Sequence, residues 1–166
     1  IIQSEYIINL NKDEKLAEEL IELKSTAEES IEELRRSLQM MRDQFDLISA
    51  LQDYCNTFQI RAKIDTVLEA EGKTWNLPAE VQLCIFRILQ ESLTNINKHS
   101  GADRVNITLF FGPSKMILSI RDNGCGFVQN VKVQHHYGLI TMGERARKVG
   151  GDLKIKSIPQ EGTTII

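Results

Sequence analysis

The stretch QESLTNINKHS, Gln90–Ser100, decides the fold because its polar groups recur at helical intervals at the end of an apolar run. Glu91, Asn95 and Lys98 stand at positions i, i+4 and i+7, so they share one face of a helix. An acid, an amide and a cation on one face can hold a hydrated magnesium ion together with a phosphate, since Mg²⁺ takes few protein ligands besides waters and phosphate oxygens. The simpler alternative is a solvated face at a helix end.

The helix that carries this stretch is predicted to run from Pro78 to Ser100. Proline is favoured at the first helical position, and Gly101 suits the position just after the last turn. His99 lies at the end of this helix, where it could be a catalytic group, a phosphate acceptor or a bystander.

Strands are predicted on both sides of this helix, with one further helix near the end of the sequence. The expected strands are 63–72, 104–111, 115–123, 152–158 and 163–166, and the further helix is 139–150. The segment GPS joins the second strand to the third, and PQEG joins the last two as a hairpin. This order predicts an α+β sandwich, with a mostly antiparallel sheet and helices on one face.

Residues 1–45 are charged, with one apolar stripe at helical spacing from Leu16 to Phe45. Asn11 followed by Glu14 predicts a helix start with a reciprocal cap. About 30 helical residues reach about 45 Å, which exceeds the width of a small domain. We therefore expect a helical hairpin that pairs with a second copy in a dimeric four-helix bundle; the alternative is a helix packed on its own domain. The predicted division is 1–45 as part of that hairpin, 46–62 as a connecting helix, and 63–166 as a second domain.

Composition excludes several classes of protein. Hydrophobic residues make up 42% and charged residues 26%, as in ordinary globular proteins, and a net charge of -3 gives no case for direct nucleic-acid binding. The three cysteines lie far apart, which argues against a disulfide framework and fits a reducing, cytoplasmic location. No run approaches the roughly 18 apolar residues of a membrane span, so we expect membrane attachment only through upstream segments.

The segment DNGCGF, Asp122–Phe127, directly follows an apolar strand. Gly124 and Gly126 allow a tight path that brings backbone close to a ligand. The Asp122 carboxylate could accept a proton from an exocyclic amine such as that of adenine. An ordinary turn explains the same residues equally well.

Two further segments could contact a ligand. Gly138 stands at a predicted helix start, where free N–H groups and the helix dipole suit a phosphate, and residues 128–137 before it are expected to form a lid. His135 and His136 are expected to be exposed loop residues. Thr163, at the opening of the last strand, could bond a nucleotide base. The P-loop, protein-kinase and GxSxG motifs are absent, so nucleotide use requires another kind of site.

The order ExxxNxxKH, DNGxGF, GLxxMxER and GT resembles the ATP-binding domain of bacterial sensor histidine kinases of two-component systems, in the gyrase, Hsp90, histidine kinase and MutL superfamily. More narrowly, it is similar to the subfamily that signals to response regulators with helix-turn-helix output domains. The resemblance covers about Lys63 to Ile166, and the preceding helices resemble that subfamily's dimerisation and phosphotransfer region. It implies a Bergerat-type α/β sandwich in which ATP and Mg²⁺ bind under a mobile lid.

The resemblance also implies roles for individual residues. Asn95 would ligate magnesium, Glu91 would position or activate the reacting group as the catalytic residue, and Lys98 and His99 would lie near the phosphates. Asp122 would bond the adenine amino group. The remaining expected ATP-binding residues shape the pocket, the lid region and the adenine end, and they are Gly124, Gly126, Gly138, Leu139 and Thr163.

The chain departs from the family pattern at the phosphoacceptor. A histidine followed by an acid is expected on the first helix of the hairpin, but the three histidines here are His99, His135 and His136. We therefore expect the acceptor upstream of Ile1, and no autophosphorylation by this fragment alone. The expected function is transfer of the ATP γ-phosphate to that histidine and then to an aspartate of the response regulator. The alternatives are a non-kinase ATPase on the same fold, or a degenerate nucleotide fold used as a dimeric interaction module.

Overall fold

The computed structural model describes residues 20, 31, 46–128 and 137–166. The chain divides into two compact units, Ile1–Phe45 and Asp46–Ile166, and the fold below is that of the second. The hairpin expected in residues 1–45 and its pairing into a bundle lie outside the described residues and stay predictions. The same holds for positions 129–136 of the expected lid, which include His135 and His136.

The second unit confirms the α+β class. Its helices are α3 (Leu47–Ala62), α4 (Ala79–Asn95), a π-helical turn η1 (Ile96–Ser100) and α5 (Tyr137–Lys148). Its strands are β1 (Asp65–Gly72), β2 (Arg104–Phe111), β3 (Met116–Asp122), β4 (Ile155–Ile158) and β5 (Gly162–Ile165). In these residues, no helix combines the length and the apolar composition needed to cross a bilayer.

The strands form one mixed sheet in the order β1-β2-β3-β5-β4. β1 runs parallel to β2, and the other three pairings are antiparallel, so the sheet is mostly antiparallel as predicted. β4 and β5 form the predicted hairpin, with Ile158 opposite Gly162. β5 lies between β3 and β4, which brings Gly162–Ile165 beside the end of β3 at Asp122.

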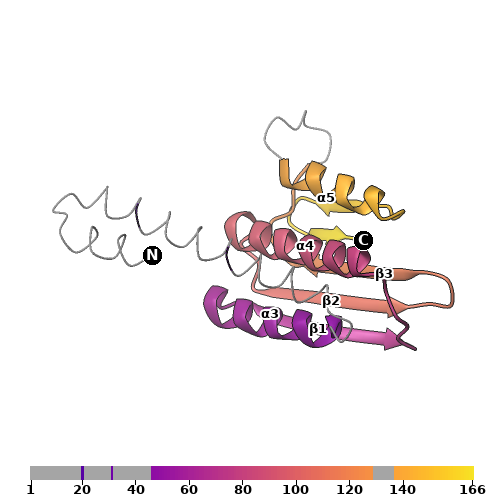
Figure 1. Ribbon diagram of the computed structural model, residues 1–166. Helices are drawn as coiled ribbons and strands as arrows, with labels where there is room; N and C mark the ends of the chain where they lie inside the picture. Colours follow the sequence, from indigo (N-terminus) through magenta and orange to yellow (C-terminus); the bar gives the residue numbers. More distant parts are fainter. Residues whose placement is uncertain (1–19, 21–30, 32–45, 129–136) are drawn as a thin grey trace. The chain divides into compact units, whose positions relative to one another are not determined.

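The helices form a layer on one face of this sheet, as Figure 1 shows for α3, α4 and α5. The alternation of exposed and buried side chains along β2 explains why the helices cover one face only. One set of its side chains is buried, and the other faces solvent. The buried set is Val105, Ile107, Leu109 and Phe111, and the exposed set is Arg104, Asn106 and Phe110. An antiparallel sheet with one packed and one solvated face has this pattern.

Residues 46–62, predicted as a connecting helix, contain helix α3, which lies in the same compact unit as the sheet. Asp46 caps its start by accepting hydrogen bonds from the N–H groups of Ile48 and Ser49 at 3.0 and 3.2 Å. Its apolar face is buried, and Tyr54 meets Phe86 of α4 edge-on, with ring centroids 5.4 Å apart. On that buried face, desolvation raises the pKa of the Cys55 thiol to about 12, so this cysteine packs as a protonated apolar group.

Helix α4 begins one residue later than predicted. Pro78 is its N-cap, and the Pro78 carbonyl accepts from the N–H groups of Val81 and Gln82 at 2.9 and 3.0 Å. The predicted stop is confirmed, because Gly101 takes a left-handed conformation with φ 61°. The last turn differs from the prediction: residues 96–100 form a π turn, in which Ser100 Oγ donates to the Ile96 carbonyl at 2.7 Å.

Candidate functional site

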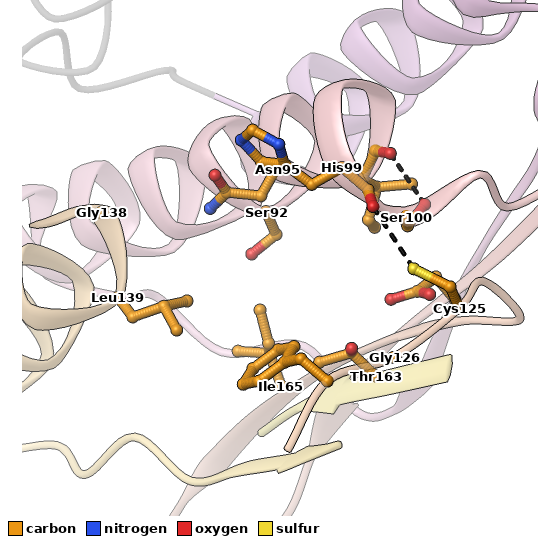
Figure 2. A pocket seen from close by; sticks show the side chains of 13 residues that line it. Ser92, Asn95, His99, Ser100, Cys125, Gly126, Gly138, Leu139, Thr163 and Ile165 are labelled. Atoms are coloured by element: carbon orange, nitrogen blue, oxygen red, sulfur yellow. Dashed lines mark hydrogen bonds between the residues drawn. The ribbon is translucent and has the colours of Figure 1, made fainter. Parts of the chain in front are cut away.

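A cavity of about 320 Å³ lies between the C-terminal part of α4, the ends of β3 and β5, and the start of α5 (Figure 2). This volume is at the lower end of the range usual for small-molecule sites. Its lining comes from four separate segments: Ser92, Asn95, Ile96, His99 and Ser100; Asp122, Cys125, Gly126 and Phe127; Gly138 and Leu139; and Thr163 and Ile165.

Most of the residues singled out in the sequence line this cavity. They are Asn95, His99, Asp122, Gly126, Gly138, Leu139 and Thr163. Glu91 and Gly124 are not part of the lining, but each contacts a residue that is. Glu91 contacts Asn95, and Gly124 contacts Ser100. Lys98 is exposed and is not part of the lining, although it was expected to share the working face of the helix. Residues of all four motifs therefore line or contact one cavity, and Lys98 is the predicted site residue that does neither.

Asp122 is the buried acid of the cavity, with 4% of its surface exposed. It ends β3 opposite Val105, and its Oδ1 accepts a hydrogen bond from the Gly124 N–H at 2.8 Å. The Thr163 N–H also donates to this carboxylate. Burial nevertheless raises the pKa of Asp122, because desolvation of the charged form outweighs these hydrogen bonds. A carboxylate held in this way has a strong tendency to accept a hydrogen bond from a ligand.

The turn after Asp122 packs closely against the end of the helix. Gly124 lies against Ser100, and a side chain at position 124 would overlap the Ser100 carbonyl oxygen. The Cys125 N–H donates to that same carbonyl at 2.7 Å, and Cys125 Sγ donates to the His99 carbonyl at 3.4 Å. This packing places Cys125 in the cavity wall beside the helix end at His99 and Ser100, and Gly126 follows it in the lining (Figure 2).

Glu91 and Asn95 meet the start of α5. Asn95 Nδ2 donates to Glu91 Oε1 at 3.2 Å, and Gly138 packs directly against the Glu91 carboxylate. In the part of the chain that the structure describes, no group donates to Asn95 Oδ1, so this amide oxygen is available to a ligand. One amide oxygen beside a carboxylate suits Mg²⁺, which needs few protein oxygens when waters and phosphates complete its shell. Within the described residues no cluster of three or more His, Cys, Asp or Glu side chains forms a metal cage.

Sequence reasoning missed six lining residues, which are Ser92, Ile96, Ser100, Cys125, Phe127 and Ile165. Ser92 and Ile96 precede His99 by seven and three positions, so helical spacing counted back from His99 could have found them. Ser92 Oγ donates to the Ile88 carbonyl at 2.6 Å and lies 3.6 Å from Met142 Sδ, which joins α4 to α5. For the others, no signal in the sequence distinguishes a cavity wall from an ordinary core position.

Replacing Gly138 with alanine is expected to weaken binding of the magnesium nucleotide that the sequence resemblance implies, while leaving the fold intact. The added Cβ would overlap Glu91 Oε1 and lie 3.5 Å from Asn95 Nδ2, so the flexible Glu91 side chain would move and release Asn95. Loss of one net hydrogen bond at the site predicts a Kd about 3- to 10-fold higher, measured by isothermal titration calorimetry.

Gly143→Ala in the same helix is the matched control. Its nearest neighbour is Arg147 Nη2 at 4.0 Å, so a Cβ fits without displacement. Alanine in a helix interior stabilises by about 0.5–1 kcal/mol relative to glycine, and we expect a higher melting temperature with an unchanged Kd. Equal Kd values for the two variants would contradict the contact between Gly138 and Glu91 as a determinant of binding.

Comparison with protein families and relatives gives a consistent result. Residues 80–166 match the family model described as histidine kinase-, DNA gyrase B-, and HSP90-like ATPase. The chain is 32% identical over 173 residues to the signal transduction histidine-protein kinase/phosphatase DegS of Brevibacillus brevis, across 100% of this chain and 45% of DegS. It is 34% identical over 106 residues to the sensor protein VraS of Staphylococcus aureus (strain COL), across 64% of this chain and 30% of VraS. The chain thus spans less than half the length of these curated relatives.

Solved structures share the fold. The histidine kinase domain of the Erythrobacter litoralis EL346 blue-light activated histidine kinase superposes with a TM-score of 0.61 at 17% identity, over 98% of this chain and 90% of that chain. The Acinetobacter baumannii histidine kinase AdeS superposes with a TM-score of 0.64 at 16% identity, over 93% of this chain and 84% of that chain.

Proposed function

The chain belongs to the histidine kinase-, DNA gyrase B- and HSP90-like ATPase family, and from this premise we propose that it is the catalytic, ATP-binding part of a two-component sensor histidine kinase. In this proposal the γ-phosphate of ATP passes to a histidine and then to an aspartate of a response regulator. The printed names of DegS and VraS, a histidine-protein kinase/phosphatase and a sensor protein, support it.

The observation that carries the proposal is the convergence of four distant segments on one cavity. A buried carboxylate (Asp122), an available amide oxygen (Asn95) and a helix start (Gly138) surround a space of about 320 Å³. Asp122 can accept a hydrogen bond from an amine, the Asn95 oxygen can ligate a magnesium ion, and the helix start at Gly138 can bind an anionic phosphate. A nucleoside triphosphate with its magnesium carries all three.

The adenine end of the site is assigned to the sheet side of the cavity. Asp122 accepts a hydrogen bond from the adenine amino group, and the Thr163 hydroxyl supports the base from β5. Thr163 Oγ1 lies 2.9 Å from Ser157 Oγ, so its orientation is fixed by the β4–β5 hairpin. Leu139 and Ile165 supply apolar contacts for the ring.

The phosphate end is assigned to the helix side. Asn95 would hold the magnesium ion, Glu91 would orient or activate the reacting group, and His99 would lie beside the phosphates, with Lys98 on the exposed surface next to it. The N-terminal turn of α5 at Gly138 offers N–H groups and the positive end of a helix dipole to the anion. A magnesium ion held there would supply positive charge that stabilises the charge developing on the phosphates.

Phosphoryl transfer requires positioning and charge stabilisation rather than covalent help from the protein. The described side chains supply positioning at both ends of the substrate. Packing of Ser92 against Met142 holds α5 over the cavity, which would exclude water from the bound phosphates. As partners we propose a second copy of the chain, joined through the predicted helical bundle, and a response regulator with a helix-turn-helix output domain.

Thermal unfolding with nucleotide tests the proposal. Mg-ATP at a hundredfold excess over its Kd should stabilise the chain by about 2.7 kcal/mol, which raises the melting temperature by several degrees. Mg-GTP is the matched control, because it places a carbonyl where adenine has an amine, opposite the Asp122 carboxylate, and it should give a smaller shift. Equal shifts would contradict the assignment of the base site, and no shift with either nucleotide would instead favour an interaction module on the same fold.

The transfer step is tested in a protein of the relatives' full length with ATP labelled at the γ-phosphate. Base-stable, acid-labile label on the protein would support histidine phosphorylation. Release of inorganic phosphate without labelled protein would favour a non-kinase ATPase.

A further inference from the structure

We propose that Asn123 is a positioning residue for nucleotide binding: it fastens the turn after β3 to the start of β2 and thereby holds the Asp122 carboxylate toward the base. This inference rests on the proposed role of Asp122 as the acceptor for the adenine amino group. Asn123 itself is exposed and is not part of the cavity lining, so it acts through its neighbour.

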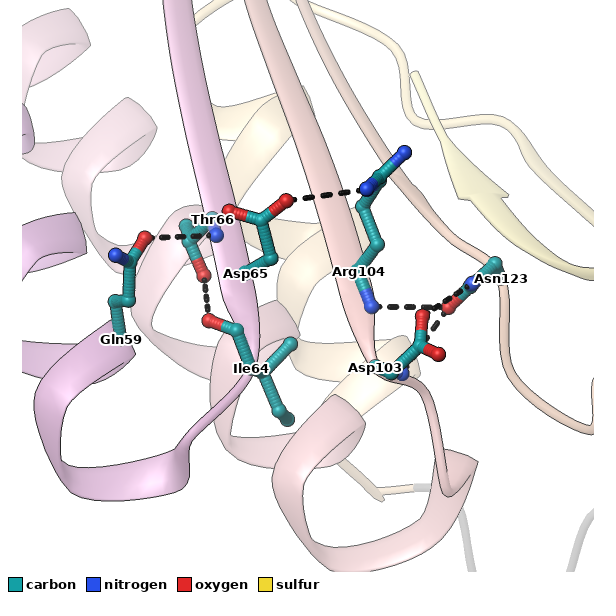
Figure 3. Close-up of polar contacts among 7 residues, drawn as sticks. All are labelled: Gln59, Ile64, Asp65, Thr66, Asp103, Arg104 and Asn123. Atoms are coloured by element: carbon teal, nitrogen blue, oxygen red, sulfur yellow. Dashed lines mark hydrogen bonds and ion pairs between the residues drawn. The ribbon is translucent and has the colours of Figure 1, made fainter.

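The side chain of Asn123 makes three hydrogen bonds to two consecutive residues (Figure 3). Its Oδ1 accepts from the N–H groups of Asp103 and Arg104 at 3.2 and 3.0 Å. Its Nδ2 donates to Asp103 Oδ1 at 2.7 Å. The Asn123 backbone N–H adds a longer bond to the Arg104 carbonyl at 3.3 Å. One residue thus joins the turn at four points to Asp103 and to Arg104, the first residue of β2.

These partners explain why the residue is an amide. Two backbone N–H groups require an acceptor, and the Asp103 carboxylate requires a donor on the same side chain. An aspartate at position 123 would keep the acceptor but oppose a second carboxylate at hydrogen-bond distance. The pair of N–H donors also fixes which way the Asn123 amide faces, because the reversed amide would direct its NH₂ group at them.

Because Asn123 directly follows Asp122, the hydrogen bonds of Asn123 also restrain the position of Asp122. Asp122 pairs with Val105, the residue after Arg104, and its Oδ1 accepts from the Gly124 N–H at 2.8 Å. Gly124 has no free space on its other side, because it lies against Ser100. Residues 122–124 are therefore held from both sides, and release of Asn123 would remove one of the two constraints on the carboxylate.

The same hydrogen-bond network extends from Arg104 to Asp65 on β1, and Asp65 provides a control position. Arg104 Nε lies 3.1 Å from Asp65 Oδ2, with side chains 61% and 51% exposed. Exposed ion pairs contribute little to stability. Asp65→Asn alters this neighbouring contact without touching the turn, so its Kd for ATP should stay within about twofold of wild type.

A double-mutant cycle tests the proposal by calorimetry with Mg-ATP. Asn123→Asp should raise the Kd about tenfold or more, because it puts two carboxylates together and loosens the turn. Asp103→Asn should stay within about threefold of wild type, because its amide oxygen can still accept from Asn123. In the double variant the introduced amide can donate to the introduced carboxylate, and the Kd should return to within about threefold of wild type.

A second ligand separates positioning of Asp122 from general loosening of the fold. Purine riboside triphosphate lacks the 6-amino group, so it cannot use Asp122 in the proposed way. Wild type should prefer ATP over this analogue, and Asn123→Asp should lose most of that preference. A purely structural role would weaken both ligands by the same factor. Melting temperatures of the unliganded variants ensure that binding is measured on folded protein.

The outcomes are distinguishable from failure of the proposed function. If wild type does not bind ATP, or does not prefer it over the analogue, the assignment of Asp122 fails. If wild type binds and discriminates as expected, three results would each overturn the role of Asn123 alone: an unchanged Kd for Asn123→Asp, no recovery in the double variant, or an equal loss for both ligands.

Discussion

Replacing Asp122 with asparagine is expected to raise the Kd for Mg-ATP about 10- to 150-fold, which corresponds to the loss of a hydrogen bond to a charged acceptor. Asn has nearly the shape of Asp, so the cavity should keep its size. Calorimetric titration measures the change. Asp152→Asn, which removes one exposed carboxylate outside the cavity lining, controls for net charge and should leave the Kd unchanged. Wild-type affinity in Asp122→Asn would refute the role of Asp122.

The same substitution should affect the unliganded fold in a pH-dependent way. Burial raises the pKa of Asp122 above its usual 3.8, so ionising this group opposes folding. Below pH 3.8 the carboxyl is protonated in both the folded and the unfolded state, so this destabilising effect is absent. Above the folded pKa the full effect is present. Asn does not titrate. The free energy of unfolding of the variant minus that of wild type should therefore rise as the pH increases from below 3.8 through the folded pKa of Asp122.

Chemical denaturation without nucleotide at several pH values measures this difference. Any bond from Gly124 or Thr163 that the amide fails to accept lowers the stability of the variant, and the rise with pH stands on top of that offset. A difference that stays constant or falls with pH would contradict the burial of a charged carboxylate at this position.

Gly126→Ala is expected to cause the largest loss of stability, about 2–5 kcal/mol out of the 5–15 kcal/mol typical of a domain. Gly126 has φ +57°, and a Cβ would overlap the Ile158 carbonyl oxygen and come within 2.9 Å of the Gly162 carbonyl oxygen. Both are backbone atoms of the β4–β5 hairpin, so relief requires the hairpin to move away. The free energy of unfolding, measured with denaturant in the absence of nucleotide, gives the result.

Gly150→Ala separates the two causes of that loss. Gly150 has φ +75°, but nothing lies within 4 Å of the position where a Cβ would stand. This control should lose only the conformational part, about 1–2 kcal/mol. If the two variants were equally destabilised, the close approach of Gly126 to the hairpin would have no energetic consequence.

The elements of the domain could be predicted from sequence because each has a strong local pattern. Strand β2 has the predicted bounds, since alternation from Arg104 to Phe111 is uninterrupted and a turn follows. Gly101 could be predicted as the helix stop because only a left-handed residue fits there. The order of the strands was not predictable in this way, because the insertion of β5 between β3 and β4 depends on packing between distant segments.

Most of the residues predicted for the site line one cavity, whereas the chemical roles assigned to them stay predictions. Asn95 and Asp122 line the cavity because their neighbours are strongly patterned. Lys98 does not, because the prediction assumed α-helical spacing throughout. The π turn at 96–100 is wider than an α turn, and its residues in the lining are Ile96 and Ser100 together with His99, which was predicted. Nothing in the local sequence signals that change of helix type.

The central place of β5 has a consequence for how the protein is made. Synthesis is vectorial, and residues 46–122 contain enough structure to begin folding as they emerge. The cavity wall at Thr163 and Ile165, however, exists only once residue 165 has left the ribosome. A nucleotide bound in the proposed site would therefore stabilise the fold only after β5 is in place, and a product that stops before β5 would contain Asn95 and Asp122 without this wall of the cavity.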